Sequence, residues 1–406
     1  MQSNWYSSTK PKGSAKPYYS SSSNRGRTNT RPRKGRGVDI DINRFIKTST
    51  GPADSKTFEI KHTFNDFSFV EGIANNLNKK GYVTPTPIQD QSIEHIMTGR
   101  DIIGLANTGT GKTAAFLLPL IDKVYKNRDQ KVLIIAPTRE LAIQIENELR
   151  EFSWGMKIFF ASCVGGMSIN YQINNLRRNP QFVIGTPGRL KDLSNRGVLH
   201  FETFNNIVLD EVDRMLDMGF VDEIRSFLKQ LPEKRQSLFF SATLPPKIKD
   251  LVNSFLNDPI TINVQTGETA VNVDQDVVRV SGKDAKFVKL QELLNQDELS
   301  KVLIFSETKR DVEKLTVNLN EKGFKAESIH GDKRQGQRQR ALADFKNNHV
   351  NILVATDVAA RGLDIKDITH VINYTVPQTY EDYIHRIGRT GRGNSKGKAL
   401  TFVEAN

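Results

Sequence analysis

A short loop of glycine, threonine and lysine constrains the fold of this chain more than any other feature. The loop runs Ala106-Asn107-Thr108-Gly109-Thr110-Gly111-Lys112-Thr113, between an apolar stretch, 101–105, and a helix-like run, 114–118. Small residues let backbone N–H groups face phosphate oxygens, while a lysine and a hydroxyl supply charge and a Mg²⁺ ligand. We therefore predict a strand, a phosphate-binding loop and a helix, with Lys112 at the β- and γ-phosphates and Thr113 on Mg²⁺. The strict pattern begins with glycine, where this chain has Ala106.

A second candidate site is the acidic run Asp210-Glu211-Val212-Asp213, which follows the apolar stretch 204–209. Open α/β sheets place their chemistry at the carboxyl ends of the strands. We therefore expect Asp210 to hold Mg²⁺ and Glu211 to orient or deprotonate an attacking water. Together the loop and the acidic run predict hydrolysis of a nucleoside triphosphate. A solvated acidic surface is the alternative, which the apolar residues before the run disfavour.

Length, charge and cysteine usage narrow the class of protein. The 406 residues allow two or three domains, and the net charge of +12 indicates a polyanionic partner. The single Cys163 excludes an internal disulfide and favours a buried structural thiol in a reducing compartment. No apolar run approaches the roughly 18 residues that a membrane-spanning helix needs. We therefore expect a cytoplasmic protein with no membrane partner.

The start of the chain is basic and of low complexity. Residues 1–38 hold nine Lys and Arg residues and no Asp or Glu. Aromatic residues interleave with these charges, as suits a segment that grips single-stranded nucleic acid by charge and stacking. Because aliphatic residues are scarce, we predict a disordered basic N-terminal tail over residues 1–56. A tail that only aids solubility and a transit peptide are the alternatives.

Beyond the tail, apolar strands alternate with segments of helical period, which predicts an α/β fold with parallel sheets. Strands are expected at 101–105, 132–136, 182–185, 204–209 and 237–240, and then at 302–305, 352–355 and 370–373. A polar stretch, 265–276, separates the two series and predicts a linker. We therefore expect two tandem parallel-sheet domains, at 57–264 and 277–406, of which the first binds the nucleotide.

The second domain contains a run of cations, His385-Arg386-Ile387-Gly388-Arg389-Thr390-Gly391-Arg392. Arginines at three-residue spacing lie along one face of a helix and its exit turn. An arginine directed at a transferring phosphoryl group stabilises the developing negative charge. We predict this role for Arg389 and Arg392. A basic helix end on the surface is the alternative.

These motifs together resemble the DEAD-box ATP-dependent RNA helicase family of superfamily 2, over about residues 64–403. The segment 81–89 resembles the family's Q motif, with Phe64 upstream, and Ser241-Ala242-Thr243 resembles the motif that links hydrolysis to strand separation. Segments that resemble the RNA-backbone motifs are 137–142, 165–166, 186–189, Ser306, Gln335 with Arg338, and 356–364.

The resemblance implies two RecA-like domains, ATP and Mg²⁺ as cofactors, RNA held through its phosphate backbone without base reading, and ribonucleoprotein partners. The residues that it assigns to the nucleotide are Phe64, Thr84, Gln89, Thr108, Gly109, Thr110, Gly111, Lys112, Thr113 and Asp364. Those that it assigns to RNA are Thr138, Arg139, Gly166, Thr186, Arg189, Ser306, Arg338 and Thr356. Asp213, Ser241, Thr243 and His385 are expected to couple hydrolysis to RNA binding.

The chain departs from the family pattern at two places. Val212 stands where the family has alanine, and the chain stops at Asn406 where family members continue into a closing helix. The second domain is therefore expected to be trimmed, or the sequence to be a fragment. Two other functions stay open: an ATP-gated RNA clamp that nucleates assemblies, and a DNA helicase or translocase of the same superfamily.

Overall fold

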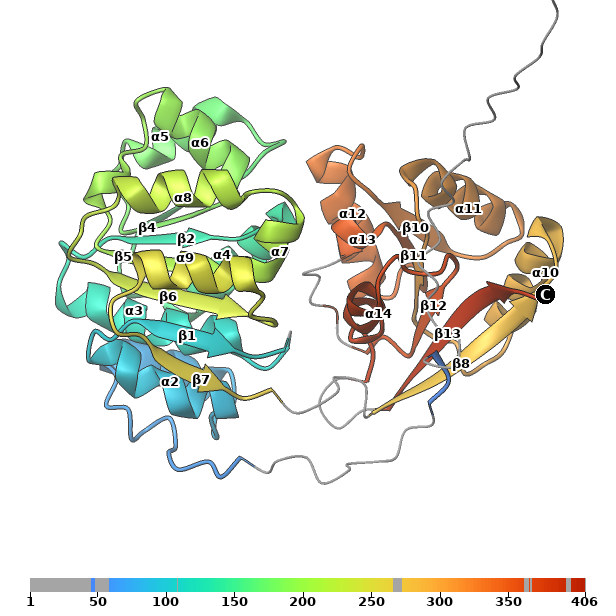
Figure 1. Cartoon of the computed structure of the whole chain (residues 1–406), viewed down its shortest axis with the longest axis horizontal. Coiled ribbons are helices and arrows are strands. Elements are labelled where there is room, and N and C mark those ends of the chain that lie inside the picture. Colours follow the sequence, from blue (N-terminus) through green and yellow to red (C-terminus); the bar gives the residue numbers. More distant parts are fainter. Residues whose placement is uncertain are drawn as a thin grey trace, which may run out of the picture. The chain divides into compact units, whose positions relative to one another are not determined.

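The computed structural model describes residues 45–47, 58–107, 109–265, 272–360, 365, 367–391 and 396–405. Residues 1–44 and 48–56 of the expected basic tail lie outside the described residues, as does half of the expected linker, 266–271. The prediction of two tandem α/β domains with parallel sheets is confirmed (Figure 1). Each domain is built around its own sheet.

The first domain has a seven-stranded sheet in the order β3-β4-β2-β5-β6-β1-β7, in which all neighbouring strands pair in parallel. Its strands are β1 (Ile102–Leu105), β2 (Val132–Ile135), β3 (Phe160–Cys163), β4 (Phe182–Gly185), β5 (Asn206–Asp210), β6 (Gln236–Ser241) and β7 (Ile260–Asn263). Its helices are α1 (Glu71–Lys79), α2 (Pro87–Met97), α3 (Lys112–Lys126), α4 (Arg139–Phe152), α5 (Ile169–Leu176), α6 (Pro187–Asn195), α7 (Val212–Asp217), α8 (Val221–Gln230) and α9 (Pro246–Phe255), with a 3₁₀ turn at Phe201–Thr203.

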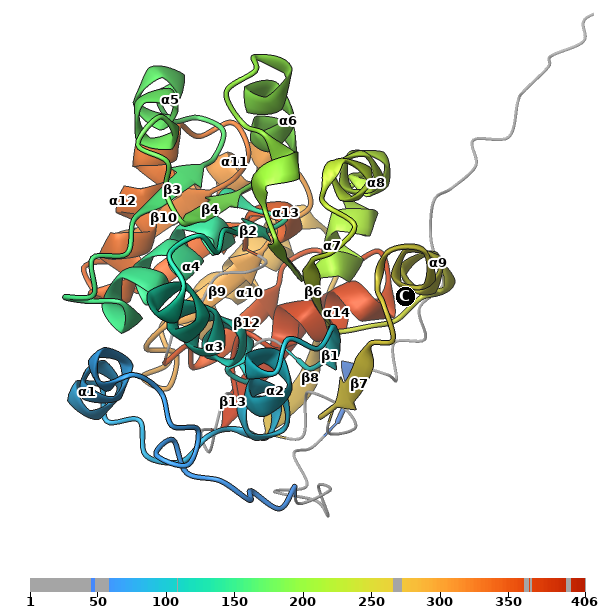
Figure 2. The ribbon, with the colours of Figure 1, turned by 90° about the vertical axis from the view of Figure 1, so that its left-hand side faces the viewer.

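Side-chain alternation along the strands builds a core on each face of this sheet. In β2, Val132 and Ile134 join a cluster with residues of α2, α3 and α4, whereas Leu133 and Ile135 join another with α6, α8 and α9. Figure 2 shows α3 and α4 on one side of the strands and α8 and α9 on the other. Because both faces are covered, the strands are continuous apolar runs, as the sequence shows.

The second domain has a six-stranded parallel sheet in the order β10-β11-β9-β12-β13-β8. Its strands are β8 (Val273–Val280), β9 (Val302–Phe305), β10 (Ala326–Ile329), β11 (Ile352–Ala355), β12 (His370–Asn373) and β13 (Gly397–Glu404). Its helices are α10 (Lys283–Leu294), α11 (Lys309–Glu321), α12 (Gln335–Lys346), α13 (Asp357–Ala360) and α14 (Tyr380–Ile387). Strand β8 begins at Val273, so the stretch 265–276 that was expected as a linker overlaps the start of this sheet.

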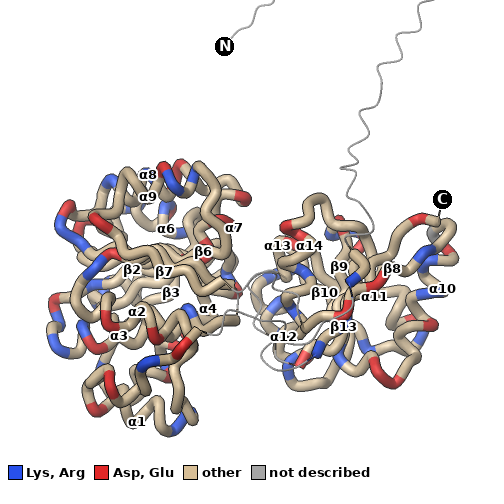
Figure 3. The backbone as a smooth tube through the Cα atoms, turned by 60° about the horizontal axis from the view of Figure 1, so that its bottom comes forward, with Lys and Arg blue, Asp and Glu red and all other residues tan. Residues whose placement is uncertain are grey.

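Local sequence explains where the helices that border the functional loops begin. Helix α2 starts at Pro87 after Thr86, which forms a capping box with Gln89. Helix α4 starts after Thr138, whose hydroxyl accepts a hydrogen bond from the Leu141 N–H at 3.3 Å. Lysines, arginines and acids are interspersed over the described backbone (Figure 3). Within that described part, no helix is both long enough and apolar enough to cross a membrane.

Candidate nucleotide and RNA site

Three neighbouring strands of the first sheet deliver the predicted nucleotide residues to one edge. In the order β5-β6-β1, β1 leads into the phosphate loop, β5 ends at Asp210 and β6 ends at Ser241. The Ala106 N–H donates to the Ser241 carbonyl at 3.1 Å, which joins the loop to the end of β6. The structure therefore gathers motifs that are far apart in the sequence.

The phosphate loop depends on glycine at Gly109 and Gly111, which have φ values of +81° and +92°. A Cβ at Gly111 would lie 2.4 Å from Gln89 Nε2, so a side chain there would also clash. Lys112 is the first residue of α3, and its ammonium donates to the Ala106 carbonyl at 2.9 Å. The Lys112 side chain thus folds back over the phosphate loop. Thr108 lies outside the described residues.

Asp210 and Glu211 stand side by side at the end of β5 and are both buried. The Glu211 N–H donates to Asp210 Oδ1 at 3.0 Å, and Glu211 has a φ of +54°, in the left-handed region that non-glycine residues rarely adopt. Burial raises the pKa of Asp210 to about 7, while Lys112 lowers it and Glu211 raises it further. Loss of solvation disfavours the charged form of this carboxyl, and such shifts cluster at functional sites.

Asp213 connects the acidic run to the loop after β6. Its Oδ2 accepts hydrogen bonds from Ala242 N–H at 3.0 Å, Thr243 N–H at 2.8 Å and the Thr243 hydroxyl at 3.1 Å. The Asp213 N–H donates in turn to Ser241 Oγ at 3.2 Å. Two of the predicted coupling elements are therefore held together by one carboxylate.

The Q-motif residues lie beside the phosphate loop. Gln89 is 2 % exposed; its Oε1 accepts from the Thr86 N–H at 2.9 Å, and its Nε2 donates to the Gly111 carbonyl at 3.0 Å. Phe64 is buried and packs edge-on against Tyr82 with ring centroids 5.7 Å apart, whereas Thr84 is exposed. Gln89 therefore holds the phosphate loop in place, in addition to the contact with the nucleotide that the resemblance assigns to it.

Six of the eight residues predicted to bind RNA line one pocket: Thr138, Arg139, Gly166, Thr186, Arg189 and Arg338. Gly166, with a φ of +79°, lets the Arg139 guanidinium lie against the glycine turn, because a Cβ would come within 2.5 Å of Nη1. Arg189 donates to Gln172 Oε1 at 2.8 Å. The other two residues, Ser306 and Thr356, follow the carboxyl ends of β9 and β11, and the Ser306 N–H donates to the Ala355 carbonyl at 3.0 Å.

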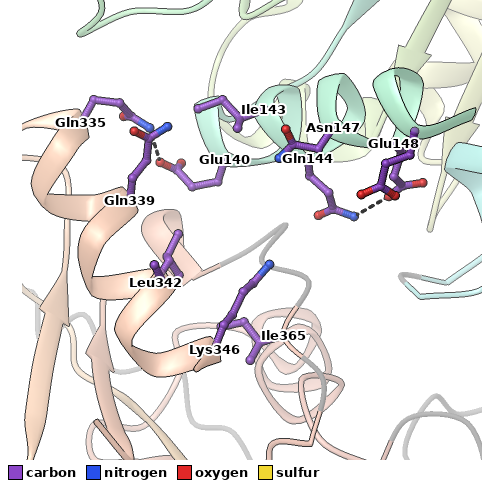
Figure 4. A pocket seen from close by; sticks show the side chains of 12 residues that line it. Glu140, Ile143, Gln144, Asn147, Glu148, Gln335, Gln339, Leu342, Lys346 and Ile365 are labelled. Carbon is purple, nitrogen blue, oxygen red and sulfur yellow. Dashed lines mark hydrogen bonds between the residues drawn. The ribbon is translucent and has the colours of Figure 1, made fainter. Parts of the chain in front are cut away.

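Glu140 on α4 contacts Gln335 and Arg338, which the sequence did not indicate. Its carboxylate accepts from Gln335 Nε2 at 3.3 Å, as Figure 4 shows. It also accepts from Arg338 Nη2 at 2.7 Å. Both members of the Glu140–Arg338 ion pair are buried. Arg338, which was expected to bind RNA phosphate, therefore binds a carboxylate of the protein in this structure. Spacing could not have revealed the pair, because 198 residues separate its members.

The arginines in the cation run of the second domain make different contacts. Arg386 on α14 makes a bidentate ion pair with Asp357, with N–O distances of 2.6 and 2.8 Å, and also donates to the Thr375 carbonyl at 2.7 Å. Arg389 follows the helix, is 3 % exposed, and donates through Nε to the His385 carbonyl at 3.2 Å. Arg386 is therefore a structural cation. Arg392 and Asp364 lie outside the described residues.

Comparisons with known proteins bear directly on these motifs. The family model "DEAD/DEAH box helicase" matches residues 86–251, and "Helicase conserved C-terminal domain" matches residues 285–394. The ATP-dependent RNA helicase CshA of Listeria monocytogenes is 46 % identical over 343 residues, which cover 84 % of this chain and 66 % of that protein. This chain belongs to the DEAD-box helicase family.

Further relatives of this DEAD-box protein agree in sequence and in fold. The CshA helicase of Limosilactobacillus reuteri is 43 % identical over 84 % of this chain and 69 % of its own length. The chain thus spans about two thirds of these curated relatives. S. cerevisiae Dbp5 bound to RNA and ADP BeF3 has a TM-score of 0.76 at 30 % identity, covering 85 % of this chain and 90 % of that chain. The two domains are therefore RecA-like, as the resemblance implied.

The raised pKa of Asp210 predicts a pH dependence of stability in the nucleotide-free DEAD-box protein. An unfolded Asp titrates near pH 4, so between about pH 4 and pH 7 the folded state binds the proton that the unfolded state has lost. The free energy of unfolding then falls as pH rises through this window, by at most about 1.4 kcal/mol per pH unit. Asp210→Asn removes this term.

The measurement is the urea midpoint of the wild type and of Asp210→Asn across pH 4.5–8. We expect the stability advantage of the variant to grow up to about pH 7 and to stay constant above it. Asp222→Asn, at an exposed position on α8, is the control and should track the wild type. An advantage that is the same at every pH would contradict the raised pKa.

Proposed function

We propose that this chain hydrolyses ATP in an RNA-stimulated reaction and uses it to unwind or remodel short RNA duplexes and ribonucleoproteins. The observation that carries the proposal is the meeting of the phosphate loop, Asp210, Glu211 and Ser241 at the carboxyl edge of β1, β5 and β6. Lys112 supplies positive charge at this edge, and the pocket that contains Arg139 and Arg189 supplies cations for a phosphate backbone.

The donor set at the strand ends suits Mg²⁺, which prefers a few carboxylate or hydroxyl oxygens together with phosphate oxygens and water. We propose Thr113 and Asp210 as its protein ligands; Mg²⁺ bound there would neutralise phosphate charge. Glu211, held in place by its backbone bond to Asp210, is the group that orients or deprotonates water. Arg389 and Arg392 would stabilise charge at the γ-phosphate, and Asp364 would bind the ribose.

RNA would be held through its backbone rather than its bases, so binding would be largely independent of sequence. Arg338 pairs with Glu140 and would exchange this carboxylate for phosphate when RNA enters. Asp213 would then transmit the change between the acidic run and Thr243. We place this activity in the cytoplasm, which a lone, buried Cys163 suits.

Two substitutions test the catalytic assignment. Lys112→Ala should abolish ATP hydrolysis, because no other described residue of the loop brings a cation to the phosphates. Glu211→Gln should also lose turnover, but it should bind ATP and RNA and release RNA slowly, since it retains an oxygen that contacts water and loses only the base. Steady-state ATPase assays and RNA dissociation rates measure the two effects.

Matched controls are Lys126→Ala, at the exposed end of α3, and Glu202→Gln, at an exposed position before β5. Both should behave as the wild type. Turnover by Lys112→Ala close to that of the wild type would refute the phosphate-loop assignment. Equally fast RNA release by Glu211→Gln and wild type would remove Glu211 as the base. Stimulation by DNA as strong as by RNA would favour a DNA translocase.

Nucleotide choice tests Gln89. If Gln89 reads adenine through its amide, Gln89→Ala should weaken ATP binding by roughly 5- to 150-fold, or about 1–3 kcal/mol, and leave GTP nearly unchanged. If Gln89 acts only by bracing Gly111, both nucleotides should weaken equally. Equilibrium binding of ATP and GTP separates the two results. Gln91→Ala, on the same helix, is the control.

The basic tail yields a prediction about salt. If about half of its nine cations bind phosphate, deletion of residues 1–38 should flatten log K for single-stranded RNA against log[salt] by about 3 units. Deletion of residues 1–9 removes no Lys or Arg and is the control. ATPase turnover at saturating RNA should not change, because every proposed site residue lies at or after Phe64. An unchanged salt slope would show that the tail does not bind RNA.

A further inference from the structure

Residues 45–47 precede the first domain in sequence, but Phe45 and Lys47 contact the second domain (Figure 1, dark blue, beside β8). The range expected as a disordered tail, 1–56, therefore contains a packed segment. The ring of Phe45 is 0 % exposed, in a range where the sequence offers few apolar residues. Such complete burial of one aromatic side chain indicates a specific binding pocket for it.

Phe45 lies in an apolar pocket between β8, β13 and α14. Its walls are Val273, Tyr383, Ile387 and Ala399. The ring of Phe45 lies 4.5 Å from that of Tyr383, centroid to centroid, at an interplanar angle of 49°. The Tyr383 hydroxyl donates to Gln275 Oε1 at 2.9 Å, so the pocket is itself fixed by a hydrogen bond to β8. Ile46, by contrast, is 50 % exposed.

Backbone pairing adds to this side-chain contact. Strand β8 is at the edge of its sheet, where one side of a strand has unpaired N–H and C=O groups. Lys47 and Gln275 form an antiparallel bridge: the Lys47 N–H donates to the Gln275 carbonyl at 3.0 Å, and the Gln275 N–H donates to the Lys47 carbonyl at 2.8 Å. The segment therefore binds as an added strand does, with an aromatic anchor for specificity.

The contact of Phe45 and Lys47 with the second domain creates a second chain connection between the two domains. Lys47 contacts the second domain, while Phe58, eleven residues further on, packs against the core of the first. At the other connection, Gln265 donates to the Ala242 carbonyl of the first domain, and Asn272 accepts from the Gly397 N–H of the second at 2.9 Å. The chain thus joins the two domains twice, at different points.

We propose that Phe45–Lys47 is an intramolecular docking segment, which occupies the free edge of β8 and the pocket against α14 and so restrains the second domain by a second chain connection. A single flexible connection limits distance but leaves rotation free, whereas two connections anchored apart limit orientation as well. Ten residues reach at most about 35–40 Å, so the restraint acts over a domain's width. The proposal rests on the proposed function in one respect: the restrained motion is the opening and closing of the ATPase.

The test uses the full chain with one donor and one acceptor dye, on cysteines introduced at the exposed positions Asn195 and Glu321. Cys163 is buried and should not compete for the dyes. Energy transfer is recorded without ligands, and again with RNA and a non-hydrolysable ATP analogue. Three proteins are compared with the parent: Phe45→Ala, the control Ile46→Ala, and a chain whose residues 50–55 are replaced by a protease site and then cut.

In the ligand-free state we expect a broader distribution of transfer efficiency for Phe45→Ala and for the cut chain, and the parent distribution for Ile46→Ala. The Gln275 amide should exchange with deuterium at least about fivefold faster in Phe45→Ala, because it loses its partner Lys47. In the cut chain the Gln275 amide should stay protected from exchange, since Phe45 remains in its pocket.

A ligand-free distribution that is the same in the cut and uncut chains would overturn the proposal, and so would unchanged exchange of Gln275 in Phe45→Ala. The cut chain keeps every residue of both domains, so it decides the question even if Phe45→Ala folds poorly. Absence of any closed state in the parent with RNA and the ATP analogue would count against the proposed function instead, and the ligand-free comparison would still judge the docking segment.

Discussion

The adjacency of β5, β6 and β1 in one parallel sheet is the constraint on which the nucleotide site depends. Parallel strands end on the same side of a sheet, so the loops after neighbouring strands meet there. The phosphate loop, the acidic run and Ser241–Thr243 follow these three strands and are thereby brought within hydrogen-bonding reach. Asp213 shows the result most directly, because one of its oxygens accepts from both Ala242 and Thr243. A displacement of either loop must disturb the other.

Burial gives this edge its electrostatic character. Asp210 is surrounded by protein and has a raised pKa, with Lys112 as the nearby cation that opposes the shift. In such a desolvated place a charge interacts more strongly than in water, which favours binding of a polyanion together with its cation. Glu211 is held in a left-handed conformation beside Asp210. Strain at such a residue persists only where the surrounding structure holds it, and it is common at functional sites.

The second domain shows how similar cations acquire different roles through their surroundings. Arg386 is held by both oxygens of Asp357, so its charge serves the fold. Arg338 is held by Glu140, a partner from a distant part of the chain. Helix α14, which carries Arg386, also forms one wall of the pocket that Phe45 fills. Phe45 of the N-terminal segment therefore packs against the helix that carries the start of the cation run.

The amino-acid sequence by itself determined the fold class, the phosphate loop and the acidic run, because these depend on local patterns: apolar runs of strand length, glycines with positive φ, and charged residues directly after strands. It also indicated, through motifs of a few adjacent residues, most residues that line the pocket containing Arg139 and Arg189. Only the tertiary structure decided four contacts: the hydrogen bond from Gln89 to Gly111, the Glu140–Arg338 ion pair, the Arg386–Asp357 ion pair and the packing of Phe45 beside β8. Each joins residues that are separated in the chain, and spacing in a sequence carries no information on which distant side chains packing will bring into contact.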